Sequence, residues 1–426
     1  MVLFFIRRYN DVDHIAPVVY KLALNEKSKI FIICLNPDIS IFDDYRLIFL
    51  IKKFNININY IFLIDSLHYS KRLVGKIICN KNMRVNTVLS KMTNQVFWVI
   101  SLFFRKIVGQ KSYYEFIDNF INQKSIENLL DYFEPRLIVF DWIKKSQHKA
   151  ELIITVCKQR KIPIIALPHG INLMTSKFHT NYEEQSEKVL LEKNKFNDFD
   201  FFVVSNELEK STRLYRGLEE NKLKVLGSAR FSKEWVKINN SIIPKYLHKN
   251  NDRDPRLKVV FMEHSSHYRA NDYEIKESIN KISKLKYINL VVKAHTRSNR
   301  FFNNFDNVNL ANSSITSTEL VMWADAVIVT MSSIALEPLL QNKVLLYPEY
   351  FHRNTTLWGD YGSCWKINSL SELVDALLLL RKKPTLKPYK KDTVNKFLDE
   401  AIYNGKSNND ILQNYVNFIQ QIKRHQ

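Results

Sequence analysis

Residues 325–338 carry the clearest structural pattern of the chain: Asp325-Ala-Val-Ile-Val-Thr-Met-Ser-Ser-Ile-Ala-Leu-Glu-Pro338. The continuous apolar run Ala326–Val329 is typical of a strand that is covered on both faces. The strand runs into the polar turn Thr330–Ser333, and the next segment, Ile334–Gln341, has the pattern of a helix. A buried strand followed at once by a helix indicates a βαβ unit, the repeating element of parallel sheets.

The same pattern recurs along the chain, where short β-branched and aromatic runs alternate with longer amphipathic stretches. Strands separated by helix-length segments predict parallel sheets. The predicted strands are Val2–Ile6, Ile30–Leu35, Tyr60–Ile64, Leu137–Phe140, Ile164–Leu167, Phe201–Val204 and Lys224–Leu226 in the first half, and Lys258–Met262, Leu290–Val292, Val308–Leu310, Ala326–Val329 and Val344–Tyr347 in the second.

A chain of 426 residues suits two domains of about 200 residues each. A polar segment with prolines at 244 and 255 separates the two series of strands. We therefore predict an α/β fold of two Rossmann-like domains with parallel sheets facing a central cleft. The predicted bounds are 1–238 for the N-terminal domain, 239–395 for the C-terminal domain, and 396–426 for C-terminal helices that, by analogy, pack back on the N-terminal domain.

The cysteine content and the net charge indicate the cellular compartment and the kind of partner. Four cysteines stand far apart without a CxxC pair, which excludes a disulfide framework and a zinc site and fits a reducing cytoplasm. The net charge of +20 calls for an anionic partner, but no basic-aromatic motif indicates nucleic acid. The inner face of the membrane is the favoured anionic surface. Residues 96–104 form either a core helix or an interfacial helix.

Polar residues follow six of the predicted strands, and ligands of open parallel sheets bind beyond the carboxyl ends of the strands. These residues are candidates for a binding or catalytic site. They are Asp141, His169, Gly227, Arg230, Glu263, His264, Lys293, His295, Arg297, Thr330, Ser332, Ser333 and Glu337.

The candidates in the second half suit a nucleotide. Ser332 or Ser333, as a helix N-cap, would direct backbone N–H groups at a phosphate, and Glu337 could accept hydrogen bonds from a ribose. His295 could donate to a phosphate oxygen or protonate a leaving group. The alternatives are an ordinary Ser-capped helix and a solvated basic loop at 293–297.

The candidates in the first half suit proton transfer. Asp141 ends a strongly apolar strand and could act as a nucleophile or base, or cap a helix. His169 could act as a base or bind an acceptor, or it could be a structural histidine in a turn. The sequence contains no GxxxxGK[ST] loop, no GxGxxG fingerprint and no GxSxG elbow, and no Asp-x-Asp motif directly follows a predicted strand, so we predict neither a cofactor nor a metal.

These motifs resemble those of GT-B glycosyltransferases of bacterial surface-polysaccharide synthesis, namely the group of Kdo transferases, sialyltransferases and CDP-glycerol glycerophosphotransferases. Lys293-Ala-His295-Thr296 is similar to their Lys-x-His-Pro element, with threonine in place of proline, and Ser332-Ser333 to their Ser-Ser element. The resemblance implies that His295 and a serine contact the phosphate of the nucleotide. Pro168-His169-Gly170 is similar to the His-Gly element of glycerophosphotransferases, which implies that His169 is a base. In some retaining Kdo transferases an N-domain aspartate attacks the donor carbon, and Asp141 matches that role.

The resemblance implies a cytoplasmic, metal-independent glycosyltransferase. Its expected partners are a nucleotide-sugar donor, with a CMP-sugar such as CMP-Kdo favoured, and a glycan or lipid-linked acceptor of capsule or lipopolysaccharide synthesis, with peripheral contact to the inner membrane as a further expectation. Two alternatives stay open: a nucleotide-sugar 2-epimerase of the same fold, and a non-catalytic polysaccharide-binding protein.

Overall fold

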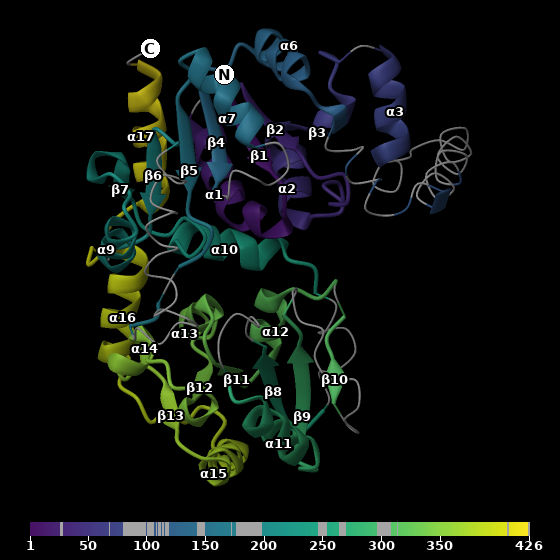
Figure 1. The fold of residues 1–426 in the computed structure, drawn as a ribbon. Helices are drawn as coiled ribbons and strands as arrows, with labels where there is room; N and C mark the ends of the chain where they lie inside the picture. The colour runs from purple at the N-terminus through teal and green to yellow at the C-terminus, as the bar shows by residue number, and fades with distance from the viewer. Residues whose placement is uncertain are drawn as a thin grey trace. The chain divides into compact units, whose positions relative to one another are not determined.

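The chain forms two compact units in a computed structural model (Figure 1). Residues 1–25, 29–67, 69–79, 99, 106–107, 109, 112, 115, 119–142, 150–171, 173–175, 198–245, 254–263, 270–295, 308–312, 314–406 and 409–424 are described. The first unit contains Met1–His169, Leu191–Trp235 and Asp410–Gln426, and the second contains Gly170–Leu190 and Val236–Asn409. The domain bounds expected from the sequence stay a prediction.

The first unit is built on a parallel sheet of seven strands in the order β3-β2-β1-β4-β5-β6-β7. Every residue of β1 is at most 1% exposed, because helices cover both faces of this central strand. The chain order reverses between β1 and β4, which makes the gap beyond these two strands the topological switch point. The strands are β1 Val2–Ile6, β2 Ile30–Cys34, β3 Asn57–Tyr60, β4 Leu137–Asp141, β5 Ile164–Leu167, β6 Phe201–Val204 and β7 Leu223–Val225.

Helices α2 and α9 of this unit begin at polar caps. The side chain of Asp44 accepts hydrogen bonds from the backbone N–H groups of Arg46 and Leu47 at the start of α2. The side chain of Asn206 accepts one from the backbone N–H of Glu209 at the start of α9. The C-terminal helix α17 packs against α1 within the unit. The helices are α1 Tyr9–Asn25, α2 Tyr45–Phe54, α3 Tyr69–Cys79, α6 Gln123–Phe133, α7 Ala150–Gln159, α9 Glu207–Tyr215 and α17 Ile411–Arg424, and α10 Lys233–Ile242 begins in this unit and ends in the second.

The second unit is built on a parallel sheet of six strands in the order β10-β9-β8-β11-β12-β13, with its switch point between β8 and β11. The strands are β8 Leu257–Met262, β9 Ile288–Lys293, β10 Asn309–Leu310, β11 Ala326–Val329, β12 Val344–Pro348 and β13 Trp365–Ile367. The helices are α11 Asp272–Ser283, α12 Ser317–Trp323, α13 Leu336–Leu340, α14 Leu357–Asp360, α15 Leu370–Lys382 and α16 Lys391–Tyr403.

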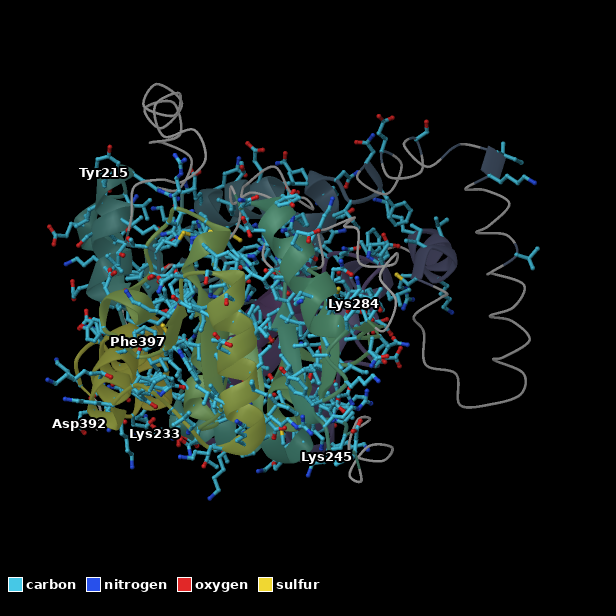
Figure 2. The ribbon with its side chains drawn as sticks, turned by 90° about the horizontal axis from the view of Figure 1, so that it is seen from below. Tyr215, Lys233, Lys245, Lys284, Asp392 and Phe397 are labelled. Carbon is cyan, nitrogen blue, oxygen red and sulfur yellow. The ribbon has the colours of Figure 1, made fainter. Side chains whose placement is uncertain are left out.

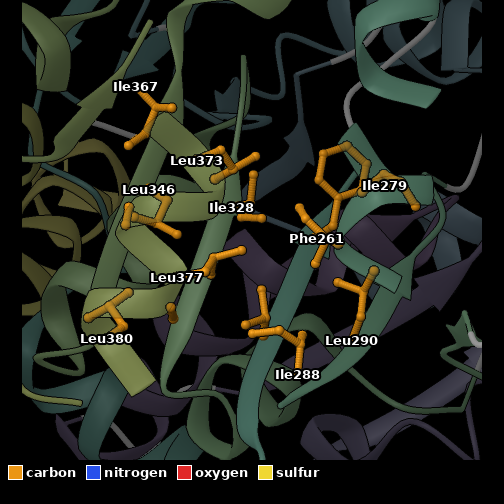
Figure 3. Close-up of a cluster of buried hydrophobic side chains, with 14 of the residues drawn as sticks. Phe261, Ile279, Ile288, Leu290, Ile328, Leu346, Ile367, Leu373, Leu377 and Leu380 are labelled. Atoms are coloured by element: carbon orange, nitrogen blue, oxygen red, sulfur yellow. The ribbon is translucent and has the colours of Figure 1, made fainter. Parts of the chain in front are cut away.

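The core of the second unit lies between this sheet and the helices α11 and α15 (Figure 3). Phe261 and Ile328 of the sheet are fully buried against Ile279 of α11 and Leu373 and Leu377 of α15. Alternate residues of β8, Leu257, Val259 and Phe261, belong to this cluster, so the remaining residues of the strand face the other side of the sheet.

The predicted strand Tyr60–Ile64 is wrong in position. The strand is β3, Asn57–Tyr60, and Ile61–Leu63 form a 3-10 helix. Since β3 is an edge strand, its apolar residues alternate with asparagines: Ile58 and Tyr60 are buried, whereas Asn57 is exposed. The apolar run after Tyr60 belongs to the turn that leaves the sheet. The predicted helix Ile334–Gln341 also differs, because a 3-10 turn, Ser333–Ala335, precedes the short α13.

The charged surface contains many lysines spread over different elements. Lys233, Lys245 and Lys284, which are labelled in Figure 2, are exposed. Within the described ranges, no helix combines the length and apolar character that a membrane span needs. The segment 96–104, predicted as a core or interfacial helix, lies outside the described residues apart from Val99.

The buried side chain of His352 makes the stability of the second unit dependent on pH. Burial lowers its pKa from 6.5 to about 4, against the smaller raising effect of a hydrogen bond with the backbone of Asn354. On acidification the unfolded chain therefore binds a proton first. The stabilisation is fully present above pH 6.5 and is lost as the pH falls towards about 4.

We expect the free energy of unfolding to fall by about 1.4 kcal/mol per pH unit through this interval because of His352. The substitution His352→Phe keeps a ring of similar size and removes the titration, so its unfolding free energy should vary less with pH. Urea titrations of both proteins between pH 4 and 7.5 test this. Equal pH slopes for the two proteins would show that His352 is not the group responsible.

Candidate functional site

The switch point of the first sheet carries a buried arginine between two aspartates. Arg7 follows β1, Asp141 is the last residue of β4, and Asp11 lies in the first turn of α1. The guanidinium Nη2 of Arg7 donates to the backbone oxygen of Asp141 at 3.2 Å, and its Nε lies 3.4 Å from Asp11 Oδ2. All three side chains are at most 2% exposed, so their charges act on one another with little screening.

Asp11 also fixes the turn that enters α1. Its Oδ2 accepts hydrogen bonds from the backbone N–H groups of Arg7, at 2.8 Å, and Arg8, at 3.3 Å. Asp11 Oδ2 thus contacts both the backbone that follows β1 and the guanidinium of Arg7. Neither Arg7 nor Asp11 is among the site residues predicted from the sequence.

His169 completes this group. It lies two residues beyond β5, and its Nδ1 is 2.7 Å from Asp141 Oδ2 and 4.0 Å from Asp11 Oδ1. Its side chain is 22% exposed, whereas both carboxyls are fully buried. An accessible imidazole held by a buried carboxyl is the arrangement of a general base with its orienting group. We name Arg7, Asp11, Asp141 and His169 the switch-point cluster.

The pKa of Asp141 lies well above its usual range. Burial is the main cause, the nearby Asp11 raises it further, and Arg7 acts in the opposite direction. Burial also lowers the pKa of the Arg7 guanidinium, against the raising effects of Asp11 and Asp141. The two carboxyls are therefore compensated only in part by the arginine.

A second ionic cluster lies beside the first along α1. Asp13 forms ion pairs with Arg46 and, at 2.8 Å, with Arg230. Burial lowers the pKa of the neighbouring His14 to about 3, with Arg230 as the next cause, so His14 is neutral at physiological pH. The sequence predicted Arg230 as a donor-binding residue; in the structure it belongs to the first unit and contacts Asp13.

Gly227 is the other predicted residue after β7. It has a φ of 89°, which favours glycine, and its carbonyl accepts a hydrogen bond from the Tyr415 hydroxyl at 2.9 Å. Gly227 thus forms a turn held by α17 within the first unit.

In the second unit, Glu263 and His295 lie together at the ends of β8 and β9. The Oε2 of Glu263, which is 5% exposed, accepts the backbone N–H of His295 at 2.7 Å. Lys293 points elsewhere: its Nζ donates to the carbonyls of Asn312, at 3.2 Å, and Ile315, at 2.6 Å. Burial lowers the pKa of Lys293. Lys293 therefore holds the segment after β10, and Glu263 holds the one after β9.

The segment after β11 contains the other four predicted residues. Ser332 caps the 3-10 turn Ser333–Ala335 by accepting from the backbone of Ile334, as expected for a serine cap. Thr330 is fully buried, and its hydroxyl has no partner in the described part of the chain. Glu337 accepts from Thr318 Oγ1 at 3.1 Å and Gln341 Nε2 at 3.3 Å, contacts that tie α12 to α13.

The structure thus gathers the predicted residues in three places. Asp141 and His169 lie together at the first switch point. Gly227 and Arg230 lie after β7. Glu263, Lys293, His295, Thr330, Ser332, Ser333 and Glu337 follow β8, β9 and β11 of the second unit. His264 and Arg297 lie outside the described residues.

The switch-point cluster is also the group that could hold a metal ion. Asp11, Asp141 and His169 each offer one ligand atom, and these atoms lie within 4.8 Å of one another. Arg7 already places a positive charge beside these residues, with its Nε at Asp11 Oδ2 and its Nη2 at the backbone oxygen of Asp141, and this charge disfavours a cation there. A cavity of about 630 Å³ lies away from the cluster, at the amino end of the sheet, where Pro163, Phe201 and Phe418 are among its lining residues.

Comparisons with known proteins reveal the fold. No family model matches the sequence, and no curated protein matches it. Among solved structures, a UDP-N-acetylglucosamine 2-epimerase from Rickettsia bellii is similar at 12% identity, with 99% of this chain and 98% of that chain covered and a TM-score of 0.53. MnaA of S. aureus, solved with UDP, is similar at 12% identity, with 100% and 96% covered and a TM-score of 0.53. A glycosyltransferase from Rickettsia africae matches at 11% identity, with 100% and 97% covered and a TM-score of 0.48. With its parallel sheets of seven and six strands, the chain has the two Rossmann-like domains of the GT-B fold.

Proposed function

We propose that the chain is a metal-independent glycosyltransferase that moves a sugar from a nucleotide-activated donor to a hydroxyl of a glycan or lipid-linked acceptor. The observation that carries this proposal is the Asp141–His169 pair, 2.7 Å apart, at the switch point of the first sheet. Transfer to a hydroxyl requires removal of its proton, and a histidine oriented by a carboxylate is suited to that task at neutral pH.

In the proposed reaction, His169 takes the proton of the acceptor hydroxyl, and Asp141 stabilises the imidazolium that forms. The acceptor oxygen bonds to the anomeric carbon while the bond from that carbon to the donor phosphate oxygen breaks, and the nucleotide leaves with the bonding electrons. The full burial of Asp141 and its contact with His169 favour this orienting role over direct attack on the donor carbon.

The second unit is proposed to bind the nucleotide. Ser332 and Ser333 follow β11, which lies at the switch point of this sheet, and His295 follows β9, which lies next to it. Ligands of α/β sheets bind at such switch points. The N–H groups and hydroxyls there are suited to phosphate oxygens, which gain charge as the nucleotide leaves. The other proposed donor-binding residues are His264, Arg297, Thr330, Glu337, Gly227 and Arg230. We propose that Lys293 and Glu263 act indirectly, by holding the segments that bind the donor in place.

A CMP-linked sugar such as CMP-Kdo is the favoured donor because of the resemblance of Lys293-Ala-His295 and Ser332-Ser333 to the Kdo transferase group. That resemblance also supports a cytoplasmic role in capsule or lipopolysaccharide synthesis. Peripheral contact with the inner membrane is part of the proposal and is supported by the net charge of +20.

A nucleotide-sugar 2-epimerase is the second candidate, and the fold likeness to the R. bellii epimerase favours it. Incubation with CMP-Kdo or UDP-N-acetylglucosamine, with and without an acceptor glycan, separates the candidates. We expect nucleotide release that depends on the acceptor. An isomer formed from the donor alone would replace the transferase with the epimerase, and glycan binding without turnover would indicate the non-catalytic polysaccharide-binding protein.

Glu263→Ala should weaken nucleotide binding by about 10- to 100-fold, because it removes the charged acceptor that holds the backbone of His295. Calorimetric titration with the nucleotide that the wild type binds measures the effect. The exposed Glu277→Ala on α11 is the matched control and should bind as the wild type does. Wild-type affinity in Glu263→Ala would remove the segment at His295 from the proposed site.

A further inference from the structure

The cavity at the amino end of the first sheet is separate from the proposed catalytic site. Its lining residues all belong to the first unit and come from the end of α7, the turn before β5, strands β6 and β7, and helix α17. The four residues of β5 span roughly 13 Å between this end of the sheet and the end that carries His169. The volume of about 630 Å³ is that of a pocket for an organic molecule and exceeds what a bare anion needs.

The apolar part of the lining contains two phenylalanines in contact. The rings of Phe201, the first residue of β6, and Phe418 of α17 lie 5.3 Å apart in an edge-to-face arrangement, and α17 lies beside β6 in Figure 1. Both side chains are half-buried, and Ile422, one turn after Phe418, also lines the cavity. Apolar surface that the fold leaves partly open is available to a hydrocarbon chain.

The basic part of the lining contains three lysines. Lys158 forms an ion pair with Asp198 at 2.7 Å. The ammonium groups of Lys161 and Lys224 form neither an ion pair nor a hydrogen bond with any residue that the structure describes. Asp200 is the acidic residue of the lining, and its Oδ2 accepts the backbone N–H of Ile164 at 2.8 Å. The lining therefore carries an excess of positive charge that suits a phosphate.

Lys161 occupies a position where the backbone favours glycine. Its φ is 57°, in the left-handed region, at the turn that ends α7. The backbone N–H of Lys161 donates to the carbonyl of Lys158 at 3.1 Å, and that of Ile162 donates to the carbonyl of Cys157 at 2.9 Å. These contacts involve only the backbone, so the turn does not need a lysine side chain.

We propose that the cavity binds one anionic phospholipid of a membrane, with the phosphate at Lys161 and Lys224 and the upper part of a chain against Phe201 and Phe418. A basic contact combined with an apolar one is what holds a peripheral protein on an anionic membrane. The inference rests on the membrane contact proposed above and gives it a location, but it does not depend on the reaction catalysed.

Calorimetric titration of the full chain with dihexanoyl phosphatidylglycerol, below its micelle concentration, tests the site. We expect one lipid per chain. We also expect binding about tenfold tighter than that of dihexanoyl phosphatidylcholine, which has no net charge, or of inorganic phosphate, which has no chain.

Lys161→Gly separates binding from stability. It should weaken lipid binding about fivefold, whereas its urea midpoint should equal or exceed that of the wild type, because glycine relieves the left-handed backbone. Lys224→Gln should weaken lipid binding to a similar degree. The matched control is Lys284→Gln, which removes one exposed lysine from the second unit and should bind the lipid as the wild type does.

Sedimentation with phosphatidylcholine vesicles that contain phosphatidylglycerol tests the membrane as the source of the lipid. The wild type should sediment with these vesicles, and Lys161→Gly should do so less than Lys284→Gln. Binding of the short-chain lipid without binding of vesicles would overturn the membrane source.

Three results would overturn the lipid site itself. They are failure of the short-chain lipid to bind, equally tight binding of inorganic phosphate, and an equal loss of lipid binding in Lys284→Gln and Lys161→Gly. The last result would assign the attraction to the net charge of the whole chain. Because no assay involves turnover, failure of this proposal and failure of the proposed transfer reaction are distinguishable.

Discussion

Asp141→Asn is expected to lower kcat by about 10³- to 10⁴-fold, with the Kd of the nucleotide changed less than about threefold. The amide that replaces the carboxylate presents a donor or a neutral acceptor to Nδ1 of His169. It therefore no longer stabilises the imidazolium, and it can favour the tautomer in which Nδ1 lacks its hydrogen. The effect falls on the chemical step, because Asp141 is fully buried in the first unit and is 2.7 Å from the imidazole.

Single-turnover rates at saturating donor measure this effect, with the exposed Asp65→Asn as the matched control. Full activity in Asp141→Asn would show that the Asp141–His169 pair is structural. A covalent sugar adduct on Asp141, detected by mass spectrometry in a His169→Gln protein, would instead show direct attack by the carboxylate and a retaining reaction.

Arg7→Met should destabilise the first unit by about 3–5 kcal/mol, because it removes the cation from two buried carboxyls and leaves their charge uncompensated. Methionine keeps much of the volume of the side chain, so the loss is chiefly electrostatic. The destabilisation should decrease at acid pH, because burial raises the pKa of Asp141 and protonation of this carboxyl removes charge that Arg7 compensates.

Urea unfolding of the wild type and Arg7→Met at neutral and acid pH tests this prediction. The control is Arg160→Met, which breaks the exposed ion pair with Asp131 and should leave stability within error of the wild type. An Arg7→Met protein as stable as the wild type at neutral pH would mean that Arg7 does not compensate buried negative charge at this site.

The buried central strands were predictable, whereas the edge strand β3 was not. Val2–Ile6 and Ala326–Val329 are continuous apolar runs because helices cover both of their faces, and their bounds match the prediction. In β3 the apolar residues alternate with asparagines, so the search for continuous runs placed the strand too late. The three-residue β13, Trp365–Ile367, was too short to give a pattern.

The candidate site was predictable as single positions but not as a group. Asp141 and His169 were found because each follows an apolar run. Their contact depends on β4 and β5 being neighbours in the sheet. Asp11 and Arg7 were missed because their contacts with Asp141 join residues about 130 positions apart, and no local pattern records them. For Lys293 the residue type was misleading. A lysine after a strand suggests phosphate binding, whereas the ammonium group of Lys293 donates to the backbone carbonyls of Asn312 and Ile315.

The most direct test of a nucleotide-sugar enzyme is a calorimetric panel of CMP, CDP, UDP, GDP and ADP against the wild type and His295→Ala. The account predicts that one nucleotide binds the wild type, with a cytidine nucleotide favoured, and that His295→Ala loses that binding. Tight binding of UDP would keep the nucleotide-sugar class and remove the CMP-linked donor. Absence of binding by every nucleotide would contradict the proposed function.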